Sequence, residues 1–205
     1  MRFTELNPDD DLEFGDFNNK KIGVCMTVSK KPPRFQIPRM YMPFGISGFT
    51  PAYGPVKYNI DFSMKGWDED GNYVNRFYNF IKSIESKLIQ HVADHSIEIF
   101  GTQIGKDELN KMFNSNIKET GDREPKFRLK IDGTTRIFDV NDVDVTTELD
   151  GGLYSRHSGV AMVEIGGVYF MNKMFGITWK MSQMKIYEPQ RLKGFQFQIT
   201  DDQDC

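Results

Sequence analysis

One stretch of the chain combines positive charge with aromatic rings and contains no acid. Between Phe17 and Ile60 there is no aspartate or glutamate. The window holds the cations Lys20, Lys21, Lys30, Lys31, Arg34, Arg39 and Lys57, interleaved with the rings of Phe35, Tyr41, Phe44, Phe49, Tyr53 and Tyr58. Cations neutralise phosphates and flat rings stack on unpaired bases, so this composition is typical of surfaces that bind single-stranded nucleic acid.

The charge of the chain is segregated along the sequence. The 205 residues carry a net charge of -3, and because the acid-free window contributes seven positive charges, the remainder carries -10. A local positive field can attract a polyanion although the whole protein is acidic. The alternative is that the rings pack in the core or in loops and the lysines solvate strand edges.

A second cationic cluster lies near the C-terminus and favours the nucleic-acid interpretation. Its cations are Lys173, Lys180, Lys185, Arg191 and Lys193, with Glu188 as the only acid among them. Trp179 shares one face of a predicted strand with Ile177 and Met181. That placement leaves two roles open, a core residue or a stacking platform worth about 1–3 kcal/mol per base.

The two ends of the chain are acidic. Residues 1–17 are expected to form a mobile arm, because six acids stand there against Arg2. Residues 199–205 form a short acidic tail, either a solubilising end or an anion that competes with nucleic acid for a basic groove. Between them, residues 18–198 are expected to form one domain with one core.

Hydrophobic periodicity predicts the elements in the first half of this domain. Residues 21–29 read as a strand, 35–42 as an extended edge piece, and 56–65 as a half-buried strand with period-two alternation. The breaker-rich stretch 43–55 is expected to be irregular, with Phe49 and Tyr53 holding the loop together. Apolar residues at spacings of three and four then predict a long helix capped by Asn72, followed by a short one over 107–113.

The second half returns to period two. Residues 126–131 alternate between apolar and cationic side chains, and Asp132-Gly133 predicts a hairpin into 135–140. Strands are expected over 160–165, 168–171 and 176–187, with a bulge at Gly166-Gly167. The elements together predict a mainly β fold, a small barrel with one long inserted α-helix.

Several classes of protein are disfavoured. No segment has the roughly 18 apolar residues of a membrane span, and Cys25 and Cys205 do not suggest a disulfide framework, so an intracellular location is expected. No nucleotide-loop or catalytic motif is present, and we expect neither an enzyme nor a cofactor. His91, Asp94 and His95 leave a metal-dependent enzyme open as an alternative, although no third ligand is identifiable beyond this helix end.

Two segments resemble a known family. The run Tyr41-Met42-Pro43-Phe44-Gly45-Ile46-Ser47-Gly48, and the stretch from Val168-Tyr169-Phe170 through Thr178-Trp179-Lys180 to Phe195-Gln196-Phe197, resemble the single-stranded DNA-binding proteins of large nucleocytoplasmic DNA viruses. These are similar in turn to the OB-fold single-stranded DNA-binding proteins of short-tailed phages. The resemblance implies a five-stranded OB-like barrel, sequence-tolerant binding of single strands, and a role in viral DNA replication and recombination. The tail departs from the family pattern, because Cys205 stands where an aromatic residue often closes it.

The interpretation is therefore a non-enzymatic, OB-like protein that binds single-stranded DNA. The residues expected to contact it are Lys30, Lys31, Arg34, Phe35, Arg39, Tyr41, Lys57, Tyr58, Tyr169, Lys173, Trp179, Lys180 and Lys185. Phe35 and Tyr41 are the preferred stacking residues. Replication proteins that contact the acidic tail are candidate partners, a membrane is not, and homo-oligomerisation is left open. A virion or scaffold protein that uses the same patch for protein contacts is the alternative.

Overall fold

A closed barrel forms the centre of the computed structural model, which describes residues 1–189. Its five strands are β4 (Met40–Met42), β6 (Lys57–Ser63), β8 (Arg123–Ile131), β10 (His157–Met171) and β11 (Met174–Tyr187). Neighbouring strands are antiparallel, except that β11 pairs with β8 in parallel through Lys180 and Lys130. β4, β6 and β8 form a meander, β8 contacts β11 in parallel, and the β10–β11 hairpin returns to β4. This arrangement makes the barrel OB-like, as the sequence predicts.

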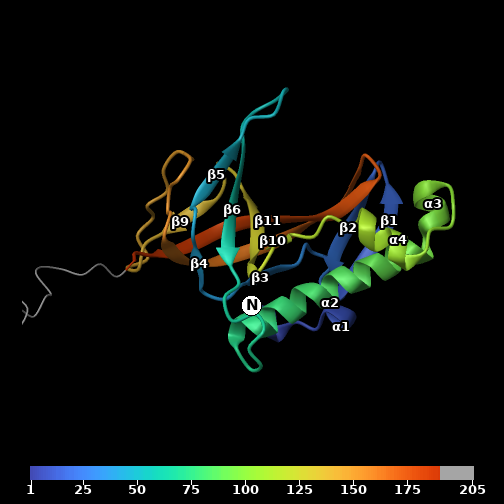
Figure 1. The fold of residues 1–205 in the computed structure, drawn as a ribbon, viewed down its shortest axis with the longest axis horizontal. Helices are drawn as coiled ribbons and strands as arrows, with labels where there is room; N and C mark the ends of the chain where they lie inside the picture. Colours follow the sequence, from blue (N-terminus) through green and yellow to red (C-terminus); the bar gives the residue numbers. More distant parts are fainter. Residues whose placement is uncertain (190–205) are drawn as a thin grey trace, which may run out of the picture.

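Further elements surround the barrel (Figure 1). The added strands are β1 (Leu12–Asn18), β2 (Lys21–Met26), β3 (Arg34–Gln36), β5 (Ile46–Phe49), β7 (Ile117–Thr120) and β9 (Arg136–Phe138). The helices are η1 (Phe3–Glu5), α1 (Pro8–Asp11), α2 (Tyr73–Asp94), α3 (Ser96–Phe100) and α4 (Lys106–Met112). No helix within residues 1–189 is long and apolar enough to cross a membrane.

The long helix α2 follows β6 and covers one end of the barrel. Asn72 caps it, because its Oδ1 accepts a hydrogen bond of 2.8 Å from the Val74 amide. The apolar stripe faces inward, and the ring of Phe77 lies 5.3 Å from that of Phe127 on β8. The helix predicted from periodicity and capping is therefore confirmed.

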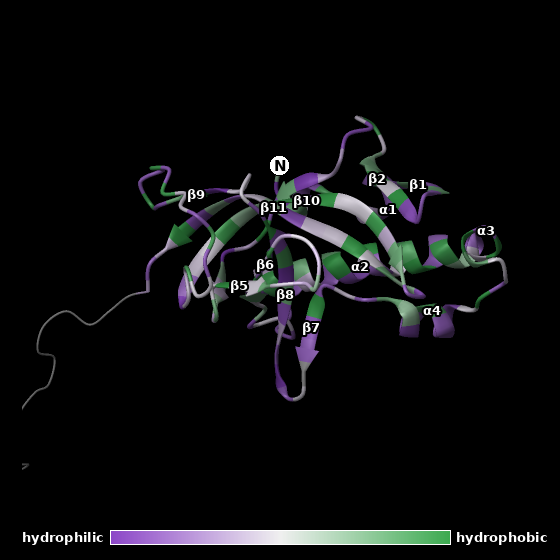
Figure 2. Ribbon diagram, turned by 90° about the horizontal axis from the view of Figure 1, so that it is seen from above, coloured by the Kyte–Doolittle hydropathy of each residue, from purple (hydrophilic) through white to green (hydrophobic). Residues whose placement is uncertain are grey.

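Trp179 lies in the middle of the core. Its ring centre is 6.0 Å from that of Phe35 and 5.3 Å from that of Phe127, both nearly perpendicular to it. Its indole nitrogen has no hydrogen-bond partner among the described residues. Figure 2 shows alternating hydrophilic and hydrophobic bands along β10 and β11. Successive side chains of a strand point to opposite faces, so this alternation places apolar side chains on the buried face of each strand.

Two predictions about strand pairing need correction. Asp132-Gly133 does not close a hairpin, because β9 pairs with β11 in parallel instead of returning along β8. The Thr135 hydroxyl donates to the Met181 carbonyl at 2.9 Å and holds the chain beside β11 at this bend. The stretch 43–55 also contains a strand, since β5 pairs with β6 as a hairpin. The predicted bulge at Gly166-Gly167 is confirmed by a register shift between Ile165 and Val168.

The prediction of a mobile acidic arm over residues 1–17 is wrong. Phe3, Leu6 and Leu12 are buried in the core, and the Phe3 ring packs at 5.1 Å against Phe77. β1 pairs with β2 and extends the sheet. These three buried side chains decide the structure of the segment, although six acids surround them, because burial of apolar surface stabilises the folded state. The tail 199–205 lies outside the described residues.

Candidate nucleic-acid interface

Strand register gathers cationic and aromatic side chains on one outer side of the barrel. Residues directly opposite one another on paired strands point to the same side of a sheet. One row runs Tyr41, Ser63, Lys126 across β4, β6 and β8. A second row runs Ser47, Asn59, Lys130, Lys180 across β5, β6, β8 and β11. We call this side the basic face, and it consists of Tyr41, Phe44, Phe49, Lys57, Lys126, Arg128, Lys130 and Lys180.

Three aromatic rings of the basic face are open to solvent. Tyr41, Phe44 and Phe49 are 44%, 53% and 61% exposed. The ammonium group of Lys126 lies 5.0 Å from the centre of the Phe44 ring, which is a cation–π contact. Tyr41 and Phe49 lie at opposite ends of β6, so the exposed rings are spread along the basic face among its cations. Exposed apolar surface rimmed by polar groups is typical of surfaces that bind a partner.

Acids on this side are already engaged. Asp61 accepts two hydrogen bonds from the Arg128 guanidinium, at 2.7 and 2.9 Å, and this contact raises the pKa of Arg128. The carboxylate of Glu124 accepts a hydrogen bond of 2.8 Å from the Ser63 hydroxyl. Lys57, Lys126 and Lys130 have no ion-pair partner among residues 1–189. These three lysines are the cations of the face that remain available to an anion.

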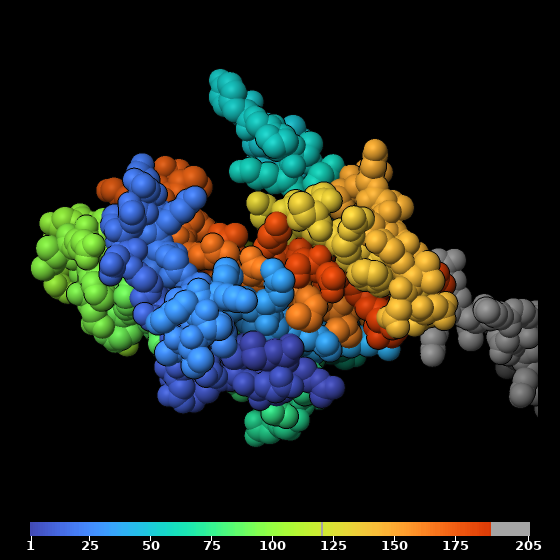
Figure 3. Space-filling view, turned by 180° about the vertical axis from the view of Figure 1, so that it is seen from behind, coloured from blue at the N-terminus to red at the C-terminus, as the bar shows by residue number. Residues whose placement is uncertain are grey.

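The β5–β6 hairpin extends the basic face away from the barrel. Figure 3 shows its tip projecting from the body and separated by a hollow from the β1–β2 and β10–β11 hairpins. Phe49 pairs with Lys57 near the tip, and Tyr53 beyond them is 94% exposed. The prediction that Phe49 and Tyr53 hold the loop is wrong, because neither ring finds a buried surface.

Four of the predicted cations carry their own counterions. Lys30 pairs with Glu13, Arg34 with Glu164 and Lys185 with Asp142, while Lys180 pairs with Asp132 at 3.1 Å. The hydrogen bonds to Glu13 and Asp142 raise the pKa of Lys30 and of Lys185. The window between Phe17 and Ile60 contains no acid, but in the folded protein acids from other segments form ion pairs with two of its cations, Lys30 and Arg34.

The prediction that two of the aromatic residues stack on bases is wrong. Phe35 and Trp179 are buried, so neither presents a face to a base. Phe35 alternates with exposed Arg34 and Gln36 on β3, which turns its ring into the barrel. The Phe80 ring of α2 packs on it at 5.2 Å. Trp179 is therefore a core residue, which is the first of the two roles that the sequence left open.

The other predicted residues are spread over the molecule. Arg39 stacks over the Tyr187 ring, with its guanidinium carbon 3.9 Å from the ring centre. Tyr58 lies on the opposite side of the hairpin from Lys57 and packs against Gly48, where a Cβ would approach its ring to 3.2 Å. Lys31 is exposed in the turn before β3. Tyr169 and Lys173 lie at the far end of the β10–β11 hairpin.

The structure adds residues that the sequence-based site omitted. Lys126, Arg128 and Lys130 occupy every outward position along the part of β8 that pairs with β6, and they alternate with the buried Phe127, Leu129 and Ile131. The alternation that predicts this strand also contained the signal, because a strand with a cation at each outward position makes a positive stripe. Phe44 stands in the acid-free window, but its exposure beside Lys126 depends on the fold of the loop, which the sequence does not reveal.

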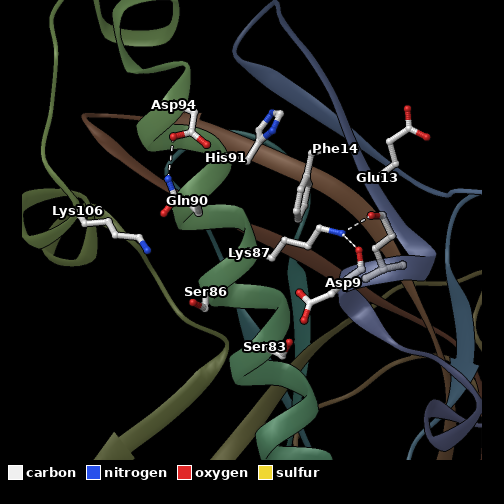
Figure 4. Close-up of a pocket in the computed structure, with 11 residues that line it drawn as sticks. Asp9, Glu13, Phe14, Ser83, Ser86, Lys87, Gln90, His91, Asp94 and Lys106 are labelled. Atoms are coloured by element: carbon white, nitrogen blue, oxygen red, sulfur yellow. Dashed lines mark hydrogen bonds between the residues drawn. The ribbon is translucent and has the colours of Figure 1, made fainter.

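His91 lies near the C-terminal end of α2, where its side chain faces the N-terminal segment (Figure 4), and His95 caps the end of the same helix. Their rings are 4.4 Å apart, and His91 also packs at 5.4 Å on Phe14. Burial, and then the neighbouring His95, lowers the pKa of His91. Within residues 1–189, no three histidine, cysteine or acidic side chains gather in a way that could hold a metal ion.

The fold and the basic face define an OB-like barrel with a cationic, aromatic outer surface. The chain belongs to a family of unknown function, DUF5871, whose sequence profile matches residues 70–199. No curated protein matches the sequence.

Among solved structures, the chain is similar to gp2.5, a single-stranded DNA-binding protein encoded by bacteriophage T7. The TM-score is 0.48 at 13% identity, over 80% of this chain and 91% of that one. It is also similar to the single-stranded DNA-binding protein from bacteriophage Enc34 in complex with single-stranded DNA. There the TM-score is 0.43 at 8% identity, over 90% of this chain and 99% of that one. Both likenesses are too distant to carry a function over, so the function has to come from the residues of this chain.

Proposed function

We propose that this protein binds single-stranded DNA along the basic face, without catalysing a reaction. The observation that carries the proposal is the Lys126–Phe44 contact beside Tyr41, where a cation and two exposed rings share one outer surface of an OB-like barrel. OB-folds bind oligonucleotides on the face of their second and third strands and on the loop that joins their first two. In this barrel those elements are β6, β8 and the β5-containing loop.

The chemistry of the face favours a single strand over a duplex. Lys57, Lys126 and Lys130 would neutralise phosphates, which both kinds of nucleic acid offer. Tyr41, Phe44 and Phe49 can stack only on bases whose faces are open, as in a single strand. Stacking is tolerant of sequence because every base has a π-face. The expected activity is therefore salt-sensitive binding with little sequence preference.

The role in viral DNA replication and recombination belongs to the same proposal. It is supported by the resemblance of Tyr41–Gly48 and of the stretch around Val168–Lys180 to viral single-stranded DNA-binding proteins. The first of these segments supplies Tyr41 and Phe44 to the basic face, and the second supplies Lys180. The barrel core that holds them contains the Trp179 of the second segment.

Fluorescence anisotropy with labelled oligothymidine tests the proposal. We expect the logarithm of the association constant to fall with the logarithm of salt concentration with a slope of about -2 or steeper, at about 0.7 per phosphate contact. An unlabelled duplex of equal length should compete less well than the single strand. Affinity that does not change with salt, or equal competition by the duplex, would contradict it.

A further inference from the structure

A pocket lies between two hairpin turns at the other end of β11. The turn from β1 to β2 is Asn19-Lys20, and the turn from β10 to β11 is Asn172-Lys173. All four residues have φ between 49° and 62°, the conformation of a tight two-residue hairpin turn. The turns are side by side, because the Phe170 amide donates to the Lys20 carbonyl at 3.0 Å and Tyr169 pairs with Lys21. The two lysines are therefore held at one rim.

The floor of this pocket is aromatic. Phe17, Phe100 and Phe170 line a space of about 700 Å³, and the Phe170 ring is 5.2 Å from Phe17 and 5.9 Å from Phe100. Met171 and Met174 continue the apolar surface to the rim, where Met171 is 64% exposed. Among the residues that line the pocket there is no acid, so Lys20 and Lys173 set its charge. We call it the twin-turn pocket.

The outer side of β11 connects the twin-turn pocket with the basic face. Every second residue of β11 points to that side of the strand. The row runs from Lys180 on the basic face, past Thr178 and Gly176, to Met174 in the pocket. Between them the Tyr169 side chain covers Gly176, where a Cβ would lie 3.0 Å from the phenol ring carbon Cζ. Its hydroxyl accepts a hydrogen bond of 2.9 Å from the Asn114 side chain, which fixes the ring. The span is about 20 Å at the rise of a strand.

We propose that the twin-turn pocket is a second subsite for the same single strand, and that it receives an unstacked base between its aromatic floor and its rim. This rests on the proposed function. Lys20 and Lys173 contact the phosphates that flank the base, and Phe17, Phe100 and Phe170 contact its ring. Charge complementarity supports a polyanion, and the connection along β11 past Tyr169 supports a strand that already occupies the basic face. An acidic peptide of a partner protein is the competing occupant.

Oligonucleotide length separates the two subsites. The double variant Lys20→Gln with Lys173→Gln removes both rim charges while keeping the aliphatic stems, and Lys106→Gln with Lys111→Gln is its matched control on α4. Oligothymidines of about 6 and about 16 nucleotides span the range that one OB-fold binds. With the long strand, the salt slope of the pocket variant should be shallower by about 1.4, at about 0.7 per phosphate contact. With the short strand, both variants should match the wild type.

A second readout locates the base directly. Long oligothymidine that carries 4-thiothymidine, cross-linked by light to the wild type, should yield adducts on the peptides that contain Phe17 or Phe170. Adducts confined to β4, β5, β6 and β8, or an unchanged salt slope in a pocket variant with wild-type thermal stability, would overturn the inference and leave the proposed function standing. Absence of binding to either length by the wild type would instead overturn the proposed function.

Discussion

The ammonium group of Lys126 lies 5.0 Å from the centre of the Phe44 ring, although 81 residues of chain separate the two. The contact brings the start of β8 against the loop that follows β4. It places a cation and an exposed ring at one point of the barrel, which is the arrangement that the proposed binding of single-stranded DNA requires.

Phe44→Ala should weaken binding of oligothymidine while leaving the protein folded. The ring is half exposed, so its removal costs little core packing but deletes a stacking surface worth about 1–3 kcal/mol, roughly 5- to 150-fold in affinity. Tyr73→Ala removes an exposed ring on α2 and serves as the control. Anisotropy titrations measure both variants, and an affinity of Phe44→Ala within twofold of the wild type would count against the basic face.

Lys130→Gln should reduce the salt dependence of binding, whereas Lys30→Gln should not. Lys130 is exposed on the basic face without an ion-pair partner among residues 1–189, so its loss removes one phosphate contact and about 0.7 from the slope. Lys30 pairs with Glu13 away from this face. Titrations over a series of salt concentrations check the prediction, and equal slopes for the two variants would refute it.

Trp179 should report on the core and not on bound DNA. In a Trp67→Phe background its emission should be blue-shifted, insensitive to iodide and unchanged by oligothymidine, because the indole is buried between Phe35 and Phe127. Trp179→Ala should lower the free energy of unfolding by about 3–5 kcal/mol, as large-to-small core substitutions do. Fluorescence and urea denaturation measure these effects, and quenching by oligothymidine would show that the indole reaches the DNA.

Glu85→Gln should stabilise the protein increasingly as the pH rises. Burial raises the pKa of this carboxyl above its ordinary value of 4.5, although the Ser115 hydroxyl and Lys82 favour the charged form. The folded protein therefore holds the proton more tightly than the unfolded chain, and deprotonation above pH 4.5 favours unfolding. Glutamine has no such cost and can still accept from Ser115. Urea midpoints at about pH 4 and pH 7 check this, with a larger gain expected at the higher pH.

Gly45→Ala should destabilise the loop that carries Phe44. Gly45 has φ +66°, and a Cβ there would lie 2.1 Å from the Leu153 carbonyl oxygen and 2.5 Å from the Ser155 nitrogen. The strained backbone and the displaced 152–155 loop should cost about 1–3 kcal/mol or more. Gly133→Ala, where a Cβ meets nothing within 4 Å, is the control. Thermal denaturation measures both variants. Equal melting temperatures would show that the 152–155 loop accommodates the added Cβ without loss of stability.

Local patterns predicted the elements more reliably than their partners. The helix from Tyr73, its Asn72 cap and the half-buried strand β6 follow from periodicity and are confirmed, because burying one stripe or one face is a local property of the sequence. The pairing of β9 with β11 was missed. A two-residue turn signal cannot report that the Thr135 hydroxyl finds the Met181 carbonyl, 46 residues further along the chain.

By itself, the sequence determined a mainly β fold with one long helix, and it determined that cations and rings are available in an acid-free window. Only the tertiary structure decided which of them face solvent together. Folding brings Glu13 to Lys30 and Glu164 to Arg34, and it turns Phe35 and Trp179 inward. It also sets the lysines of β8 beside Tyr41 and Phe44. The physical reason is that charge pairing and ring burial depend on distances in space, which residues far apart in the chain acquire only when the barrel closes.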